Sequence, residues 1–243
     1  MTPDWLLYLI TDRHLIGDRP LTEVVAAALH GGIRAIQLRE KDLSSRDLLR
    51  HATDLIPLTR SAGAVLLIND RIDVALAVGA DGVHLRTDSL PTRVVRRVLG
   101  PRKLIGVSTH SLADVRRAAE EGADFVTFGP VFATPSKARY GRPLGLDALA
   151  EVCRWSPIPV YALGGMGGDR IASAMAAGAR GVAMISAVMS QRDVRSAAAA
   201  CLAAAEVHGP AARLTHVSAG VTIQSHTGAS RNTSIGLLGR EGP

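Results

Sequence analysis

The chain has 243 residues, of which 47% are hydrophobic and 21% charged, enough for a sizeable core in one large α/β domain or two small ones. Its formal net charge is +6, but aromatic residues make up only 3%, so recognition of nucleic-acid bases by stacking is disfavoured and a small anionic partner is expected instead. No apolar run approaches the ~20 residues of a membrane span, and the first residues lack a basic segment with a cleavage site, so we expect a cytoplasmic protein with no membrane association.

Short apolar segments rich in Val, Ile and Leu recur along the chain. They span residues 6–10, 33–38, 64–69, 81–85, 103–108, 124–128, 159–163 and 180–185. Each segment is nearly continuously apolar, which is typical of a parallel strand covered on both faces. Between them lie amphipathic stretches rich in Ala and Leu, such as 21–30, 111–121 and 169–177, and these predict helices.

The rhythm of these segments predicts the fold class. Gly79, Gly122 and Gly178 each follow a helical stretch, as expected of a left-handed cap before the next strand. Eight β-α units in this length predict an α/β fold, a (β/α)8 TIM barrel over residues 1–207. A doubly wound sheet is the alternative, but no dinucleotide-binding fingerprint follows the first strand. Residues 208–243 are polar and aperiodic, so we expect a poorly ordered tail there.

Residues capable of chemistry collect after the predicted strands, where the loops of a TIM barrel build the active site. Lysine occurs only at positions 41, 103 and 137, and Lys41 and Lys137 both follow strands. The other residues of this kind, in chain order, are Gln37, Arg39, Asn69, Asp70, His84, Ser108, Thr109, His110, Thr134, Ser136, Gly164, Gly165, Ile185 and Ser186.

Each of these residues also has a structural explanation. The charges of Arg39 and Lys41 could pair at the surface with Glu40 and Asp42. The polar residues after the third and fifth strands could cap the helices that follow. His84 could be packed or hydrogen-bonded within the rim rather than catalytic, and the glycines after the seventh strand could serve the backbone alone.

Taken together, the strand ends predict two anion sites at one mouth of the barrel. The glycines after the seventh strand and Ser186 after the eighth occupy the usual phosphate location of a TIM barrel, where backbone N–H groups bind the anion. Arg39, Lys41 and Lys137 would form a second site across the mouth. Asp70 among these cations is explained if Mg²⁺ is bound, because this ion takes carboxylate and phosphate oxygens together. Two facing sites predict two small phosphorylated substrates.

The order of the segments QLREK, IND, GVSTHS, FGPVFATPSK, ALGGM and GVAMISA resembles the thiamine phosphate synthase superfamily, which includes a thiazole tautomerase branch. The likeness runs from about residue 6 to 205. It implies a transferase that joins hydroxymethylpyrimidine pyrophosphate to thiazole phosphate, with release of pyrophosphate, through a dissociative, cation-like transition state. The protein's task is then mainly electrostatic stabilisation and positioning.

The resemblance also implies a role for each matching residue. Asp70 would ligate Mg²⁺, and Gly165, Ile185 and Ser186 would hold the thiazole phosphate. The pyrimidine pyrophosphate would be bound by Gln37, Arg39, Lys41, Asn69, Ser108, Thr134, Ser136 and Lys137, of which Arg39, Lys41, Ser108 and Lys137 are predicted to be catalytic.

Two positions depart from the pattern of this superfamily. Ser89, in the stretch HLRTDSLP, stands where the synthases usually carry a second metal-binding Asp, and a hydroxyl is the weaker ligand. Asp88 lies one position earlier and is not expected to replace it. Pro130 stands where the tautomerases carry a His that transfers protons, and proline has no such proton.

These departures leave three functions in order of preference. The synthase comes first, because Mg²⁺ could still be held by Asp70, the pyrophosphate and water. A tautomerase, an isomerase of a thiazole carboxylate phosphate, is the alternative and would need His84 or His110 as its proton relay. A non-catalytic binder of thiamine precursors is the third. Cys153 and Cys201 are expected to be reduced thiols, and the oligomeric state is left open, a homo-oligomer included.

Overall fold

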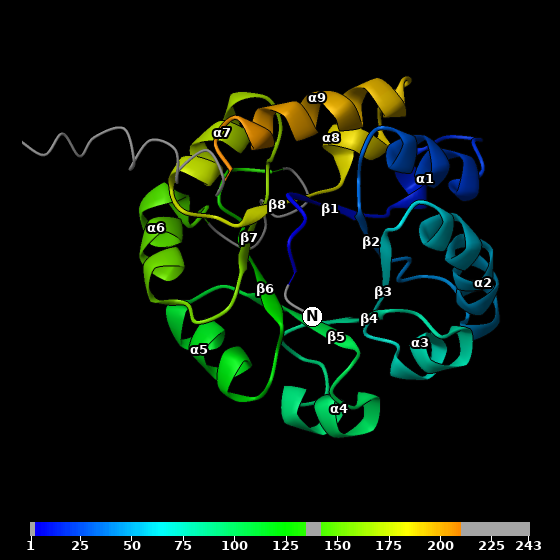
Figure 1. Cartoon of the computed structure of the whole chain (residues 1–243), viewed down its shortest axis with the longest axis horizontal. Helices are drawn as coiled ribbons and strands as arrows, with labels where there is room; N and C mark the ends of the chain where they lie inside the picture. Colours follow the sequence, from blue (N-terminus) through cyan, green and yellow to red (C-terminus); the bar gives the residue numbers. More distant parts are fainter. Residues whose placement is uncertain (1–2, 135–141, 210–243) are drawn as a thin grey trace, which may run out of the picture.

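The fold is a closed barrel of eight parallel strands, seen in a computed structural model that describes residues 3–134 and 142–209. Each strand pairs with the next, and β1 also pairs with β8 (Figure 1). The strands are β1 (Leu7–Ile10), β2 (Ala35–Leu38), β3 (Val65–Asn69), β4 (Gly82–Leu85), β5 (Leu104–Thr109), β6 (Phe125–Phe128), β7 (Val160–Leu163) and β8 (Gly181–Met184). The predicted TIM barrel is confirmed, and the doubly wound alternative is wrong because the sheet closes.

Helices form an outer ring around the strands (Figure 1). They are η1 (Arg13–Leu15), α1 (Leu21–His30), α2 (Ser45–Ser61), α3 (Ile72–Val78), α4 (Thr92–Leu99), α5 (Leu112–Glu120), α6 (Gly145–Trp155), α7 (Asp169–Ala176), α8 (Ser186–Met189) and α9 (Val194–Glu206). The helices predicted at 21–30, 111–121 and 169–177 are therefore confirmed to within one residue at each end. Within residues 3–134 and 142–209, no helix is long and apolar enough to cross a membrane.

One predicted glycine cap is confirmed, whereas the predicted tail is not tested. Gly79 adopts the expected left-handed conformation (φ 66°, ψ 33°) after α3, where it allows the chain to turn into β4. The predicted tail at 208–243 lies outside the described residues, apart from His208 and Gly209. The division of the chain at residue 207 therefore stays a prediction.

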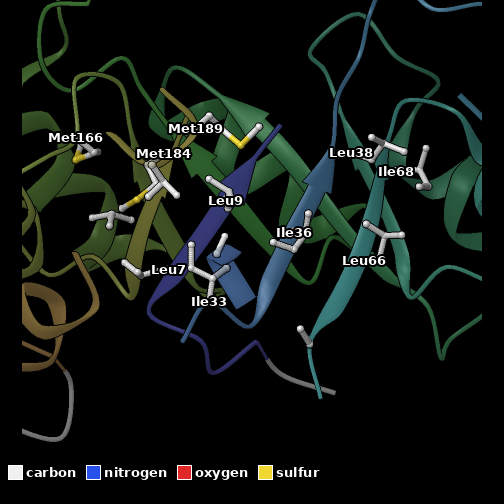
Figure 2. Close-up of a cluster of buried hydrophobic side chains, with 14 of the residues drawn as sticks. Leu7, Leu9, Ile33, Ile36, Leu38, Leu66, Ile68, Met166, Met184 and Met189 are labelled. Atoms are coloured by element: carbon white, nitrogen blue, oxygen red, sulfur yellow. The ribbon is translucent and has the colours of Figure 1, made fainter. Parts of the chain in front are cut away.

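The outward face of the strands builds the main core against the helices. Figure 2 shows Leu7 and Leu9 of β1, Ile36 of β2 and Leu66 of β3 among these side chains, all at 1% exposure or less. The alternate residues of the same strands point into the barrel and are also buried. Because both faces are covered, these strands read in the sequence as continuous apolar runs rather than as alternating ones.

Aromatic residues fill the amino-terminal half of the barrel interior. Tyr8, Phe125 and Tyr161 meet there, and Trp5, just before β1, stacks on Tyr161 and packs edge-on against Phe125 with ring centroids 5.9 and 5.8 Å away. The Tyr161 hydroxyl donates to the backbone oxygen of Trp5 at 2.9 Å. This end is therefore closed by apolar packing, and the polar inward residues lie toward the carboxyl ends of the strands, as a TIM-barrel active site requires.

Gly106 makes room for this interior, and its substitution is expected to destabilise the fold. A Cβ atom at this position would stand 2.5 Å from the Nδ1 of His84 and would also overlap the Phe125 ring. We therefore expect Gly106→Ala to lower the free energy of unfolding by about 1–3 kcal/mol, the usual cost of overpacking. Urea denaturation followed by circular dichroism measures it. A change below about 0.5 kcal/mol would show that the interior yields at this point.

Candidate active site

The stretch QLREKD separates its charges by side. Glu40 is buried, and its carboxylate accepts hydrogen bonds from the Thr11 hydroxyl at 2.6 Å and from the Arg13 backbone N–H at 3.1 Å. Asp42 accepts two hydrogen bonds of 2.5 Å from the Arg13 guanidinium. Both acids are therefore tied to the β1–α1 connection, and the alternative in which they serve as the surface partners of Arg39 is wrong. An extended chain sends its alternate residues, Arg39 among them, to the other side.

Arg39 is half-buried next to the barrel interior, and its role in binding an anion stays a prediction. Its backbone N–H donates to the Thr11 hydroxyl at 2.9 Å, and it comes two residues after the inward-facing Gln37. Burial lowers the pKa of the guanidinium. Its charge in turn lowers the pKa of His84, after the larger effect of burial, and His84 lies inside the barrel. Positive charge is thus held at the mouth of the barrel.

A chain of hydrogen bonds crosses the upper interior and joins two of the predicted site residues. Gln37 donates from Nε2 to the Tyr8 hydroxyl at 3.0 Å, which lies 3.2 Å from the Nδ1 of His84. The Nε2 of His84 is 3.1 Å from the Ser108 hydroxyl. If Tyr8 donates to His84, the imidazole donates in turn to Ser108, and the Ser108 proton is left for a bound ligand.

This network decides two of the alternatives raised by the sequence. His84 is buried, and its pKa is lowered to about 3, first by burial and then by the Arg39 charge, so that the ring is neutral. It is hydrogen-bonded within the barrel, as the structural explanation held. Ser108 bonds to His84, whereas Ser111 caps α5 by accepting from the Asp114 N–H, so the capping explanation is wrong for Ser108.

Asp70 is fixed at the end of β3 in an unusual backbone conformation. Its φ is +62°, and its N–H donates to the backbone oxygen of His84 at 3.0 Å. The carboxylate accepts a short hydrogen bond from the Ser89 hydroxyl, and its other oxygen is 4.0 Å from the Arg86 guanidinium. Arg71 occupies the cap position of α3, so the capping explanation is wrong for Asp70. The strained conformation and the directed carboxylate are typical of a functional position.

The side chains around Asp70 bear on metal binding. Among residues 3–134 and 142–209, no group of three or more His, Cys, Asp or Glu side chains could hold a metal ion. Asp88 is bound to Arg86 rather than turned toward Asp70, as expected. A Mg²⁺ ion that is shared with substrate oxygens commonly takes only one or two protein carboxylates, and Asp70 offers one, so magnesium binding at this position stays a prediction.

The predicted phosphate site lies at the ends of the neighbouring strands β7 and β8. Gly164 and Gly165 both have positive φ, and a Cβ atom on Gly165 would stand 2.8 Å from the backbone oxygen of Ala133. The chain passes this close to the loop after β6, which only glycine allows. Ile185 and Ser186 form the start of α8, directly after β8. The structure therefore brings these residues together, and phosphate binding by them stays a prediction.

The remaining predicted residues are placed as follows. Asn69 ends β3, where it lies opposite His84 in the strand register. Lys41 is exposed and lies close to Asp88. The pKa of Asp88 is lowered first by the Arg86 hydrogen bond and, among smaller causes, by the charge of Lys41. Thr134 is half-buried at the limit of the described segment. Ser136 and Lys137 lie outside the described residues.

Tyr8, Thr11, Arg13 and Arg86 contribute to the site without having been predicted. Tyr8 had a recognisable signal, since a hydroxyl within a strand that is buried on both faces requires a partner. Arg13 is separated from Glu40 by 27 positions in the sequence, and nothing in the local pattern connects them.

The fold and the strand-end residues define a TIM-barrel enzyme with cationic side chains on one side of its mouth and glycine-rich backbone on the other. Residues 7–188 match the family model described as thiamine monophosphate synthase. The chain therefore belongs to the thiamine monophosphate synthase family, as the resemblance indicated.

Individual relatives agree with this assignment. A protein named "Putative thiamine-phosphate synthase" from Geobacter sulfurreducens is 54% identical over 200 residues, covering 82% of this chain and 94% of that protein. A thiamine-phosphate synthase from Roseiflexus sp. is 47% identical over 192 residues, covering 79% and 81%. The solved structure of a thiamine phosphate pyrophosphorylase from Pyrococcus furiosus superposes with a TM-score of 0.77 at 38% identity, covering 84% of this chain and 96% of that one.

The neutral His84 predicts how stability depends on pH. Its folded pKa of about 3 lies below the ordinary value of 6.5, so the unfolded chain binds more protons between these two values. This contribution to the free energy of unfolding is therefore complete above pH 6.5 and falls as the pH drops toward 3, by at most about 1.4 kcal/mol per pH unit. His84→Gln should flatten that slope. Urea titrations at pH 4.5, 5.5 and 6.5 measure it, and equal slopes in both proteins would contradict the burial of a neutral ring.

Proposed function

We propose that this protein is a thiamine-phosphate synthase, which joins hydroxymethylpyrimidine pyrophosphate to thiazole phosphate and releases pyrophosphate. The observation that carries the proposal is the arrangement of the mouth. Arg39 follows β2 and its charge acts on His84 inside the barrel, and Gly165, Ile185 and Ser186 follow the neighbouring strands β7 and β8. A reaction between two phosphorylated molecules requires two such anion sites. Family membership and relatives that are named for this activity support the same reaction.

The chemistry follows from the charge that the reaction releases. As the bond between the pyrimidine methylene carbon and the pyrophosphate oxygen breaks, negative charge grows on the leaving group. Arg39 and Lys41, with Lys137, would stabilise that charge, and Ser108, whose oxygen lies beside the His84 ring, would donate its proton to a substrate oxygen. The thiazole nitrogen then forms the new C–N bond with its lone pair. The glycine-rich backbone of the phosphate site would hold it in line.

Mg²⁺ would be held by Asp70 together with the pyrophosphate oxygens, with the Ser89 hydroxyl beside it. When bound, it would neutralise part of the charge on the leaving pyrophosphate. The role of the protein here is to keep the Asp70 carboxylate turned toward the mouth. The Ser89 hydroxyl, which also accepts the Arg86 N–H at 2.8 Å, fixes one of its oxygens.

The tautomerase reading finds less support in the same site. One candidate relay, His84, is buried and poorly basic. The other, His110, is exposed, and its Nδ1 contacts the backbone oxygen of Gly129. His84 therefore lacks the accessible, basic imidazole that proton transfer at neutral pH requires, and one ring nitrogen of His110 is already engaged by the backbone. A non-catalytic binder of thiamine precursors would give ligand binding without turnover. A cytoplasmic location and a homo-oligomeric state stay predictions from the sequence.

The position of Ser89 predicts a gain in activity. Ser89→Asp would place a second carboxylate beside Asp70, so we expect it to lower the Mg²⁺ concentration for half-maximal formation of thiamine phosphate, on the order of tenfold. The assay supplies both substrates and varies Mg²⁺. Ser89→Ala is the control, because it removes the hydroxyl and adds no charge, and it should not show the gain. If neither the wild type nor Ser89→Asp makes thiamine phosphate, the transferase proposal fails.

Lys137 and Lys103 allow the effect of losing a lysine in the predicted pyrophosphate site to be compared with the effect of losing one elsewhere. Lys103 lies at the opposite end of the barrel, where it donates to the backbone oxygen of Ala80 at 2.5 Å. Lys137→Ala should therefore raise the KM for the pyrimidine pyrophosphate by about tenfold or more, and Lys103→Ala by less than about twofold. Steady-state kinetics of both variants test this. Equal effects would mean that Lys137 is only a surface charge.

A further inference from the structure

Arg86 is a basic residue at the mouth that the predicted site does not include. It directly follows β4, two residues after the inward-facing His84, just as Arg39 follows Gln37 on β2. Its side chain is 39% exposed, and its guanidinium lies 4.0 Å from the outer oxygen of Asp70. Arg86 therefore stands at the edge of the pyrophosphate site, on the far side of β3 from β2.

Arg86 is also close enough to Arg39 for the two charges to repel each other. Burial is the largest cause of the lowered pKa of Arg39, and the charge of Arg86 lowers it further, against the favourable effects of Asp12 and Glu40. Two guanidinium groups that face the same space are stabilised by an anion between them. Asp70 supplies a single carboxylate to this space, and Ser89 already bonds to one of its oxygens.

The side chain that now neutralises Arg86 is an exposed carboxylate from its own turn. Asp88 accepts two hydrogen bonds from the guanidinium, one from Nε at 2.8 Å and one from Nη2, and its side chain is 66% exposed. The pKa of Asp88 is lowered first by the Arg86 hydrogen bond and, among smaller causes, by the charge of Lys41. One exposed carboxylate thus lies among cations from two loops.

Such a pair is easily exchanged. An exposed ion pair contributes about 0–1 kcal/mol, because water and salt screen it. A pyrophosphate carries several charges, and its paired oxygens match the fork of a guanidinium in the same bidentate manner as a carboxylate. A pyrophosphate at the mouth would therefore displace Asp88 from Arg86 and relieve the repulsion between Arg86 and Arg39 at the same time.

We propose that Arg86 is a further pyrophosphate-binding residue of this site, and that Asp88 is the internal counter-ion which the pyrophosphate replaces. The inference rests on the proposed function for the choice of ligand. It adds a cation from β4 to those from β2, on the side of the mouth where the chain offers Ser89 in place of a second metal-binding carboxylate.

The chain contains a matched control for this proposal. Arg71 and Asp73 form the same kind of pair two residues apart, with Nε to Oδ1 at 2.8 Å and Nη2 to Oδ2 at 2.5 Å. Their side chains are 35% and 65% exposed, close to the values of Arg86 and Asp88. Arg71 adjoins Asp70 in the sequence and occupies the cap position before α3. The two pairs thus share charge, geometry and exposure, and they differ in that Arg86 lies close enough to Arg39 to lower its pKa.

The test is a calorimetric titration of the full chain with inorganic pyrophosphate in the presence of Mg²⁺. We expect Arg86→Ala to weaken binding by about tenfold or more and Arg71→Ala by less than about twofold. Asp88→Asn removes the competing carboxylate, so it should tighten binding about threefold, whereas Asp73→Asn should leave it unchanged. Thermal unfolding of each variant verifies that it is folded. Asp88→Asn retains Arg86 and so gives a result even if Arg86→Ala does not fold.

The outcomes separate this inference from the proposed function. Equal weakening by Arg86→Ala and Arg71→Ala, or no pyrophosphate binding by the wild type, would overturn the role of Arg86. A weaker or unchanged affinity in Asp88→Asn would overturn the exchange. If Arg86→Ala selectively weakens pyrophosphate binding but the wild type forms no thiamine phosphate from both substrates, the anion site stands and the synthase proposal fails. If thiamine phosphate forms but the two arginine variants behave alike, the synthase proposal stands and the role of Arg86 fails.

Discussion

The arrangement of the active-site mouth depends on the buried carboxylate of Glu40. A carboxylate that is removed from water must be hydrogen-bonded and paired, and Thr11 and Arg13 meet this requirement from the connection after β1. In doing so they fix which side of the extended chain the acids occupy. Arg39 is thereby sent to the other side, over the barrel. The charges of the stretch QLREKD could have paired with one another at the surface. Because the two acids are bonded elsewhere, Arg39 is left as a cation at the site.

The interior of the barrel divides into an apolar half and a polar half, and the polar half serves the site. The aromatic side chains near Trp5 close the amino-terminal end, where the Tyr161 hydroxyl donates to the Trp5 backbone. Above them, Tyr8 and His84 link Gln37 to Ser108. Satisfied networks of this kind hold side chains in one orientation, which is what electrostatic catalysis requires, because dipoles fixed in advance need not reorganise during the reaction.

The barrel could be predicted well from the sequence because each strand is a short apolar segment. An amphipathic stretch with the period of a helix separates it from the next strand. The strand ends shifted by one or two residues, as at β2, which begins at Ala35 rather than Ile33, because burial of a residue does not itself require strand pairing. The site was predicted only in part. Residues that follow strands could be found by position, whereas the partners of Glu40 and Asp70 come from other loops, and only the folded chain brings them together.

Arg86 illustrates the same limit on reading chemistry from the sequence. Beside Asp88 it forms an ordinary surface pair, and the sequence gives no reason to set it apart from the pair of Arg71 and Asp73. What distinguishes it is the neighbouring Arg39, from a strand that does not adjoin β4 in the barrel. Its role follows from the closure of the sheet, which places the ends of β2, β3 and β4 around one space.

A crystal structure of the protein soaked with inorganic pyrophosphate and Mg²⁺ tests the central claim most directly. The account predicts the anion between the ends of β2 and β4, in contact with the guanidinium groups of Arg39 and Arg86, with Asp88 turned away. Pyrophosphate bound only at the glycine-rich ends of β7 and β8, with Arg39 pointing away from the barrel, would contradict it.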